Sequence, residues 1–187
     1  MLEELSRRYK TTGIDNSRAM LRLAAEKSPR SELIFGDISR FSLRGRFDAI
    51  VCPFDTINHV TSLRLWRKVF ENAHAHLKPD GVFIFDVNTE HKMEMYRADP
   101  VTVDFHEGAF STVSVRRIRR WRYQVDLTLY REVASDSFRR YQMRLPELIV
   151  PTQRILAELS RLFRRVTLLD PDRRRRSEEH TSELQSH

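Results

Sequence analysis

Acidic residues at the ends of predicted strands are the side chains best placed for ligand chemistry. Asp15 ends a short β-branched strand, Asp37 follows a second apolar stretch, and the segment 52–58 (CPFDTIN) ends a third. In open α/β sheets, ligands bind at this carboxyl-terminal edge. A carboxylate held there can accept hydrogen bonds from both hydroxyls of a ribose, and a second can accept them from an exocyclic amine. The pattern suits an adenosine, although Asp15 before Ser17 is also typical of a helix cap.

The elements that must position these residues alternate between helix and strand. Residues 63–77 show the clearest helical stripe, and residues 82–87 form an apolar run of the buried parallel-strand type. Residues 78–81 (KPDG) are typical of a turn between the two. The expected order is helix 2–10, strand 11–15, helix 17–28, strand 33–35, strand 47–54, helix 63–77 and strand 82–87. This alternation predicts an α/β fold with a doubly wound, mainly parallel sheet.

The character of the sequence changes after residue 90. Residues 101–145 contain Val-, Thr- and Tyr-rich pieces that alternate with period two, which predicts an antiparallel meander. A helical pattern follows over residues 151–163, and residues 166–169 are compatible with one more strand. We therefore divide the chain into a core (1–90), an inserted β-rich region that could cover a substrate (91–150), a returning helix and strand (151–175) and a tail (176–187). The tail resembles a translated sequencing adapter, and we do not expect it to belong to the fold.

Composition narrows the class of protein. The 187 residues suit one domain, and no apolar run approaches the roughly 20 residues that a membrane helix needs. The single cysteine, Cys52, excludes an internal disulfide and favours a cytoplasmic protein. The net charge of +7 comes mostly from 28 Arg against 5 Lys. Such a balance permits an acidic partner, including nucleic acid, without identifying one.

Four segments resemble the class I S-adenosylmethionine-dependent methyltransferases, in the order and at the spacing of that family. They are TTGIDNSRAMLRLA, FGDISRF, FDAIVCPFDTINHV and HLKPDGVFIFDVNT. The likeness covers residues 2–90 well and residues 91–170 loosely, and the FDTIN and FDVNT pieces look most like members that act on small molecules. It implies a Rossmann-like fold, S-adenosylmethionine as cofactor, and methyl transfer to a small-molecule acceptor. Positioning two bound reactants can supply much of that catalysis, so the chemistry requires no dedicated base.

The resemblance also implies roles for two groups of residues. Those expected to bind the cofactor are Asp15, Asn16, Asp37, Ile38, Cys52, Pro53 and Phe54. Those expected at the mouth where the methyl acceptor arrives are Asp55, Asn58 and His59. Within the first group, Asp15 would hold the ribose hydroxyls and Asp37 would meet the adenine. No catalytic base is assigned; His59 is the nearest candidate and also suits a structural role.

The family's glycine-rich turn between its first strand and first helix has no counterpart, because Gly13 is the only glycine before Asp15. We therefore expect a fragment, truncated at both ends, whose sheet lacks its first and central strand. Two buried strands would then lose a shared hydrogen-bonding partner. Because domains are stable by only about 5–15 kcal/mol, we expect the isolated chain to be unstable, inactive and without measurable affinity for the cofactor.

Other interpretations of the residues stay open. A degenerate module could bind a nucleoside or a protein without catalysis. The segment 116–123 (RRIRRWRY) could bind RNA, with arginines on phosphates and aromatic rings on bases, although a solvated strand with inward aromatics is favoured. His74 and His76 do not form a metal pair, because helical residues two apart do not face each other. Cys52 has no nearby base and suits a buried strand better than a nucleophile.

Overall fold

The structure is a computed structural model that describes residues 1–105, 108–135 and 137–169. The predicted tail, residues 176–187, lies outside the described residues. The elements are α1 (Leu2–Ser6), β1 (Thr12–Asp15), α2 (Arg18–Lys27), β2 (Glu32–Phe35), β3 (Phe47–Cys52), the 3-10 helix η1 (Thr56–His59), α3 (Leu63–His76), β4 (Leu77–Phe85), α4 (Glu90–Ala98), β5 (Val101–Phe105), β6 (Ala109–Arg119), β7 (Arg122–Ala134), β8 (Ser137–Leu148) and α5 (Thr152–Leu159). No helix among these residues is long and apolar enough to cross a membrane.

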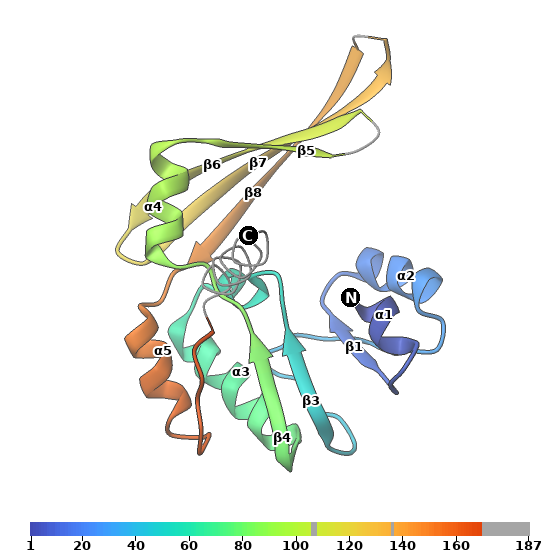
Figure 1. The fold of residues 1–187 in the computed structure, drawn as a ribbon, viewed down its shortest axis with the longest axis vertical. Helices are drawn as coiled ribbons and strands as arrows, with labels where there is room; N and C mark the ends of the chain where they lie inside the picture. The colour runs from blue at the N-terminus through green and yellow to red at the C-terminus, as the bar shows by residue number, and fades with distance from the viewer. Residues whose placement is uncertain (106–107, 136, 170–187) are drawn as a thin grey trace, which may run out of the picture.

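Strands β3 and β4 form a parallel pair with helices α3 and α5 packed on one face (Figure 1). The helices contribute Trp66, Phe70 and Ile155 to a buried cluster, and Phe83 and Phe85 of β4 pack against it. The Trp66 indole also donates a hydrogen bond to the Val60 carbonyl at 2.8 Å. This cluster is the main core of the molecule, and it fixes the end of β3 where the loop to η1 begins.

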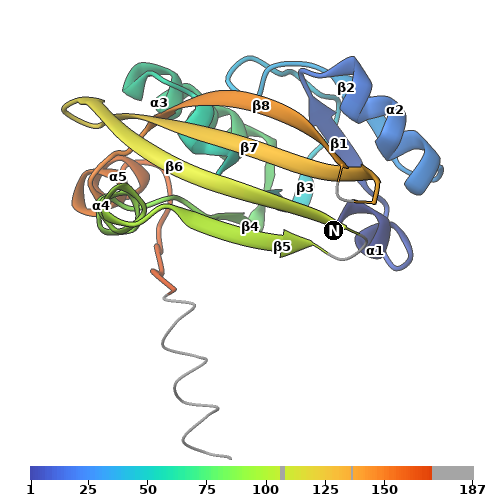
Figure 2. The same ribbon diagram turned by 90° about the horizontal axis from the view of Figure 1, so that it is seen from above.

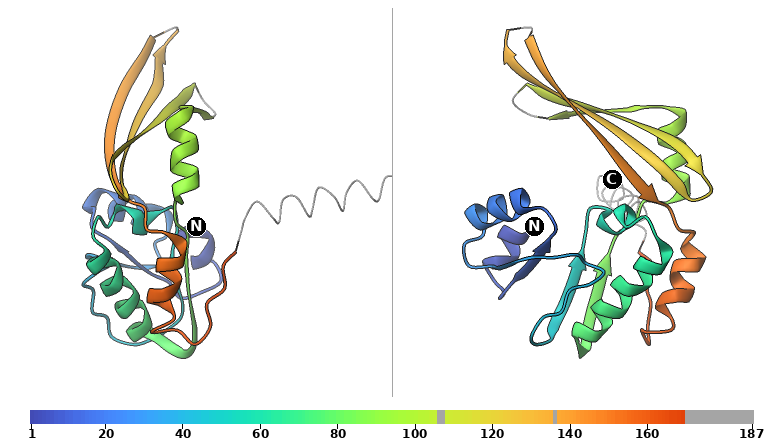
Figure 3. Two further views of the ribbon diagram at one scale, coloured as in Figure 1. Left: turned by 90° about the vertical axis from the view of Figure 1, so that its left-hand side faces the viewer. Right: turned by 180° about the vertical axis from the view of Figure 1, so that it is seen from behind.

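Strands β1 and β2 form a second parallel pair, and no ladder in the described chain joins it to the β3–β4 pair. The view from behind shows α1, β1 and α2 to one side of β3 (Figure 3). Strands β1 and β3 therefore each have an edge without a strand partner. The prediction of a Rossmann-like fold with a mainly parallel sheet is confirmed, and the break in hydrogen bonding falls where the predicted central strand would lie.

The second face of the β3–β4 pair is largely uncovered. Val51 is 38% exposed and its register partner Ile84 is 52% exposed, whereas the neighbouring Cys52 and Phe85 point into the core. Parallel strands are normally covered on both faces. The described chain thus forms only one of the two helical layers that a doubly wound sheet requires over these strands.

The predicted antiparallel meander is present as a four-stranded sheet in the order β5-β6-β7-β8. Seen from above, it extends across the parallel layer, with α4 beside it (Figure 2). Met93 of α4 packs against Val115, Tyr123 and Val125 in a second buried cluster. The division of the chain at residues 90 and 150 stays a prediction, but it matches the change from parallel to antiparallel pairing.

Two local predictions were wrong. Residues 166–169 form no strand; Val166 instead packs against the main core as irregular chain. Residues 78–81 are not a separate turn but lie inside β4, where they form an irregularity opposite the start of β3, since Phe47 pairs with Leu77 and Ala49 with Val82. Gly81 suits this position because a Cβ there would lie 2.9 Å from the Phe47 carbonyl oxygen.

The open strand edges predict uneven hydrogen exchange. Strand β7 is paired on both sides, whereas β1 and β3 are each paired on one. We expect amides of β7 near Val125 to exchange at least about tenfold more slowly than amides of β1, because local opening is easiest where ladders are incomplete. Exchange measured by NMR or mass spectrometry checks this, and equal protection of β1 and β7 would contradict it.

Candidate functional site

Asp15 is the last residue of β1, and Asp37 lies two residues after the end of the adjacent strand β2. The Asp15 Oδ1 atom accepts a hydrogen bond from the Ser17 amide at 2.7 Å, and Ser17 in turn caps α2. The Asp37 Oδ1 atom accepts from the amide and the hydroxyl of Ser39, and these bonds lower the pKa of Asp37. In both residues Oδ1 accepts a hydrogen bond from the backbone amide two residues later, and Oδ2 takes no part in this turn. The helix-cap and ligand interpretations of Asp15 are therefore compatible.

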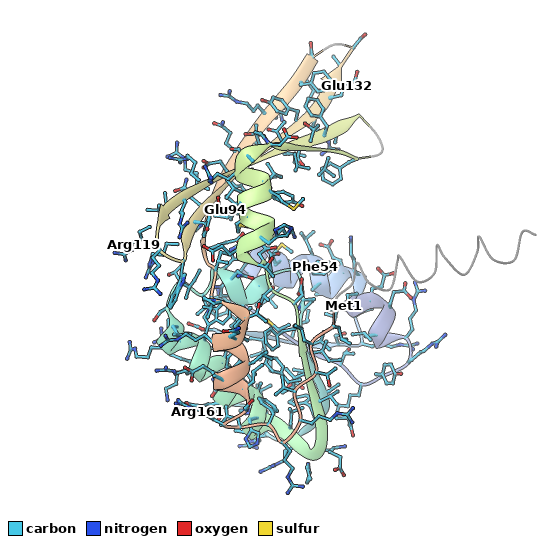
Figure 4. The ribbon with its side chains drawn as sticks, turned by 60° about the vertical axis from the view of Figure 1, so that its left-hand side comes forward. Met1, Phe54, Glu94, Arg119, Glu132 and Arg161 are labelled. Carbon is cyan, nitrogen blue, oxygen red and sulfur yellow. The ribbon has the colours of Figure 1, made fainter. Side chains whose placement is uncertain are left out.

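The chain turns sharply where β3 ends. Phe54 and Asp55 both have left-handed backbone conformations, with φ of 59° and 47°. Two consecutive non-glycine residues in this region are costly and are typical of functional loops. The Asp55 amide donates to Asp86 Oδ2 at 3.2 Å, which ties this turn to the end of β4. Phe54 is left 73% exposed, at the height where the parallel layer meets the antiparallel sheet (Figure 4).

A buried amide pair, Asn58 and Asn88, connects the two layers. Asn58 is completely buried; its Nδ2 atom donates to the Leu148 carbonyl at 2.9 Å, and its Oδ1 atom accepts from the Asn88 amide at 2.9 Å. These bonds join η1 to the end of β4 and to the end of β8. Because both ends of its amide are engaged, Asn58 presents no free polar atom to an acceptor. Its position indicates a structural role, in place of the predicted contact at the mouth.

The side chain of Asn88 brings two carboxylates together. Its Nδ2 atom donates to Asp55 Oδ2 at 2.8 Å and to Glu147 Oε2 at 3.0 Å. Ligand atoms of Asp55, His59 and Glu147 all lie within 4.8 Å of one another. Glu147 is only 3% exposed, and burial, followed by the nearby Asp55 charge, raises the pKa of its carboxyl. Three groups from the β3–η1 turn and from β8 therefore form one small acidic site, whose residues could in principle also hold a cation.

The structure separates the remaining predicted residues. Cys52 points into the main core, where burial raises the pKa of its thiol to about 11, so it is no nucleophile at neutral pH. Ile38 packs against the same core, and Pro53 is half-buried beside it. Asn16 is exposed next to Asp15. Of the residues predicted at the mouth, Asp55 and His59 lie together and Asn58 lies behind them.

Glu147 was missed by the sequence analysis. The available signal was a single acid within the otherwise apolar run 145–150 (LPELIV) at the end of a long strand. A charged residue in such a run is nearly always paired or functional. Its partners, Asp55 and Asn88, are far away along the chain, and only the crossing of β8 over the end of β4 brings them to it.

Part of the arginine-rich segment 116–123 is paired within the protein, since Arg116 and Arg117 form ion pairs with described residues. Tyr123 is buried, and its hydroxyl donates to Glu94 at 2.9 Å, which, together with burial, raises the pKa of Tyr123 to about 12. Arg117 lies 3.4 Å from Glu90, and Arg116 lies 3.1 Å from Asp126. The Tyr123 ring is therefore not available to stack on a base. This agrees with the favoured interpretation, in which the segment is a strand whose aromatic side chains point inward.

Replacing Asn58 should weaken the junction between the layers. Asn58→Ala removes the acceptor of the Asn88 amide and a donor to the Leu148 carbonyl, and we expect a loss of about 2–4 kcal/mol in the free energy of unfolding. Urea unfolding followed by tryptophan fluorescence measures it. Asn72→Ala is the matched control, because the Asn72 Nδ2 atom is buried without a hydrogen-bond partner. A cost no larger at Asn58 than at Asn72 would contradict the assigned role.

The raised pKa of Glu147 predicts how stability depends on pH. A folded state that raises an acid's pKa binds protons more tightly than the unfolded state, so stability falls as the pH rises above the ordinary range of a glutamate. Glu147→Gln removes this loss and keeps an acceptor for Asn88. We expect a higher urea midpoint for the variant at pH 7 and no difference near pH 4. An unchanged or lower midpoint at pH 7 would show that the buried charge is not destabilising.

Comparison with known proteins finds similarity to methyltransferases over part of the chain. Residues 1–81 match a family model described as a methyltransferase domain. The chain is 35% identical over 74 residues to a dTDP-3-amino-3,6-dideoxy-alpha-D-glucopyranose N,N-dimethyltransferase from Streptomyces fradiae, a match that covers 40% of this chain and 29% of that protein.

Two solved structures share the fold. An S-adenosylmethionine-dependent methyltransferase from Clostridium acetobutylicum superposes with a TM-score of 0.74 at 24% identity, over 84% of this chain and 65% of that one. The amino pentose methyltransferase CalS10 from Micromonospora echinaspora gives 0.73 at 20% identity, over 86% and 69%. The chain spans less than half the length of the curated relatives that it matches. Over residues 1–81 the chain thus matches a methyltransferase domain, and its fold is that of S-adenosylmethionine-dependent methyltransferases.

Proposed function

We propose that this chain is part of an S-adenosylmethionine-dependent methyltransferase that acts on a small-molecule acceptor. The observation that carries the proposal is the pair of carboxylates, Asp15 and Asp37, at the carboxyl-terminal edge of the adjacent parallel strands β1 and β2. This edge is where open α/β sheets bind nucleotides. When bound, the cofactor would supply an electrophilic methyl group on a sulfonium.

The residues present fit the adenosine half of that cofactor. Asp15 is half-buried and has one carboxylate oxygen outside its turn, which suits the ribose hydroxyls. Asp37 is exposed, and its lowered pKa keeps it a hydrogen-bond acceptor for the adenine amine. The ring of Phe54 is exposed enough to contact a ligand at the end of β3. Asn16, Ile38, Cys52 and Pro53 would contribute mainly backbone at the same edge, since their side chains are exposed, packed on the core or half-buried.

For the methionine half of the cofactor, the described residues offer no comparable binding groups. The five glycines of the chain lie at positions 13, 36, 45, 81 and 108, and none of them is in a turn from a strand into a helix. We propose that the complete site requires one more parallel strand between β1 and β3, followed by a glycine-rich turn. Support comes from the two open strand edges, β1 and β3, and from the absence of a ladder between the two described parallel pairs.

The acceptor proposed is a sugar-sized molecule with an amine. The relatives from Streptomyces fradiae and Saccharopolyspora spinosa are named as N,N-dimethyltransferases of amino deoxysugars attached to dTDP. An acidic site formed by Asp55 and Glu147 next to the cofactor edge suits a cationic amine better than it suits a phosphate or a carboxylate. We also propose a cytoplasmic location, which the single reduced cysteine supports.

Cofactor binding tests the proposal. The 187-residue chain is expected to show no measurable binding of S-adenosylmethionine by calorimetry. The same chain, extended at its amino end by a strand, glycine-rich turn and helix from a solved relative, is expected to bind it and to transfer labelled methyl groups to an amino sugar. Micromolar binding by the shorter chain would refute the need for a further strand, and no binding by the longer one would refute the assigned cofactor.

In the extended protein, Asp15→Asn should weaken cofactor binding about 10- to 100-fold, because a charge-assisted hydrogen bond is worth about 1.5–3 kcal/mol. Asparagine keeps the Oδ1 acceptor for the Ser17 amide, so the start of α2 is preserved. Asp48→Asn is the matched control, since Asp48 lies at the opposite end of β3 and pairs with Lys78 on the surface. Equal effects of the two substitutions would sink the assignment of Asp15.

A further inference from the structure

The acidic site at the layer junction contains a buried carboxylate, Glu147, that forms no salt bridge with a described residue, although His59 and Lys92 lie near it. Glu147 is 97% buried. Among the described residues it accepts a hydrogen bond from Asn88 and forms no ion pair. A buried carboxylate without a cationic partner is costly to maintain. In contrast, Glu158, which is similarly buried, is paired with Arg67 at 2.6 Å and with Arg161 at 3.3 Å. The difference points to a cationic ligand for Glu147.

The surroundings of Glu147 define the chemistry that such a ligand must have. The charged groups that face it are Asp55 from the turn after β3, His59 from η1 and Lys92 from α4. The Lys92 Nζ atom donates one hydrogen bond to Asn88 Oδ1 at 2.9 Å, and no salt bridge joins it to Glu147 among the described residues. Asp55 is half-buried and His59 is exposed, so the site opens to solvent on their side and is closed by Glu147 behind them. A small cation with N–H donors can enter from that opening and meet both carboxylates.

We propose that Glu147 and Asp55 bind the ammonium group of the methyl acceptor, and that Glu147 accepts its proton before methylation. This assignment rests on the proposed function, and it adds the residues that select and activate the acceptor. In this step an N–H bond of the ammonium breaks and an O–H bond forms on Glu147, which converts an ion pair into a neutral acid and a neutral amine. The nitrogen lone pair released in this way is what a sulfonium methyl donor requires.

The local environment favours that direction of proton transfer. Burial and the Asp55 charge raise the pKa of Glu147 toward that of an amine, which reduces the mismatch between donor and acceptor. Asn88 holds both carboxylates at fixed distances through its Nδ2 atom, while the strained conformation of Asp55 directs that residue at the site. Glu147 would thus be a catalytic residue, and Asn88 a positioning residue that acts through it.

The experiment uses the 187-residue chain and a matched pair of probes, glucosamine and glucose, which differ in an ammonium and a hydroxyl. We expect glucosamine, but not glucose, to shift the ring resonances of His59 and the side-chain amide resonances of Asn88 in NMR titrations. Glu147→Gln should weaken glucosamine binding at least about tenfold, which is about 1.4 kcal/mol. Glu71→Gln, at an exposed glutamate of α3, is the control and should leave binding unchanged.

The pH dependence provides a second readout that a merely structural Glu147 would not show. Glucosamine affinity should fall on acidification at a higher pH than the ordinary range of a glutamate, and should fall again where the amine loses its proton. Glu147→Gln should abolish the acidic limb. Equal binding of glucose and glucosamine, or binding of Mg²⁺ or Zn²⁺ in place of the amine, would overturn the proposal.

Failure of this assignment can be distinguished from failure of the proposed function. If the extended protein methylates an amino sugar equally well with Glu147→Gln across the pH range, the function stands and the role of Glu147 is refuted. If the amine binds in a Glu147-dependent way but the extended protein binds no S-adenosylmethionine, the ammonium site stands and the methyltransferase proposal is refuted.

Discussion

The arrangement of the molecule depends on one buried amide pair. Asn58 and Asn88 satisfy each other and the Leu148 carbonyl, and through these bonds the 3-10 helix after β3, the end of β4 and the end of β8 are held together. Buried amides are expensive unless every donor and acceptor is matched. The pair therefore permits essentially one placement of the antiparallel sheet on the parallel layer. That placement brings Glu147 beside the turn after β3, and the same Asn88 side chain spaces Glu147 from Asp55.

The parallel layer presents the opposite situation, because its hydrogen bonding is incomplete. The β1–β2 pair carries the two carboxylates suited to adenosine, and the β3–β4 pair carries the turn with Phe54 and Asp55, but no ladder connects the two pairs in the described chain. Exposed Val51 and Ile84 add an uncovered apolar face. The junction around Glu147 is thus held by side-chain hydrogen bonds, whereas no backbone ladder among the described residues fixes the β1–β2 pair relative to the β3–β4 pair.

Much of this fold could be predicted from the sequence, for local reasons. The helical stripe around Trp66 and Phe70 and the apolar runs of β3 and β4 have periods that specify helix and buried strand directly. Prediction failed where tertiary contacts override local pattern. The KPDG segment became a bulge within β4 because its neighbours pair with β3. Val166 packs on the core without a strand partner among the described residues, while Leu168 and Leu169 are exposed. Asn58 was expected to meet the acceptor, but its burial behind Asp55 is a property of the layer junction.

The sequence by itself determined the fold class, the order of the elements and the acids at strand ends, because these depend on short-range periodicity and on motifs that are continuous in the chain. Only the tertiary structure decided which polar groups share a site. Asp55, His59 and Glu147 are brought within 4.8 Å because β8 crosses the end of β4, and that crossing is fixed by the Asn58–Asn88 pair. Burial, which removes Glu147 almost completely from solvent, is likewise a consequence of two layers meeting, and no single segment of the sequence encodes it.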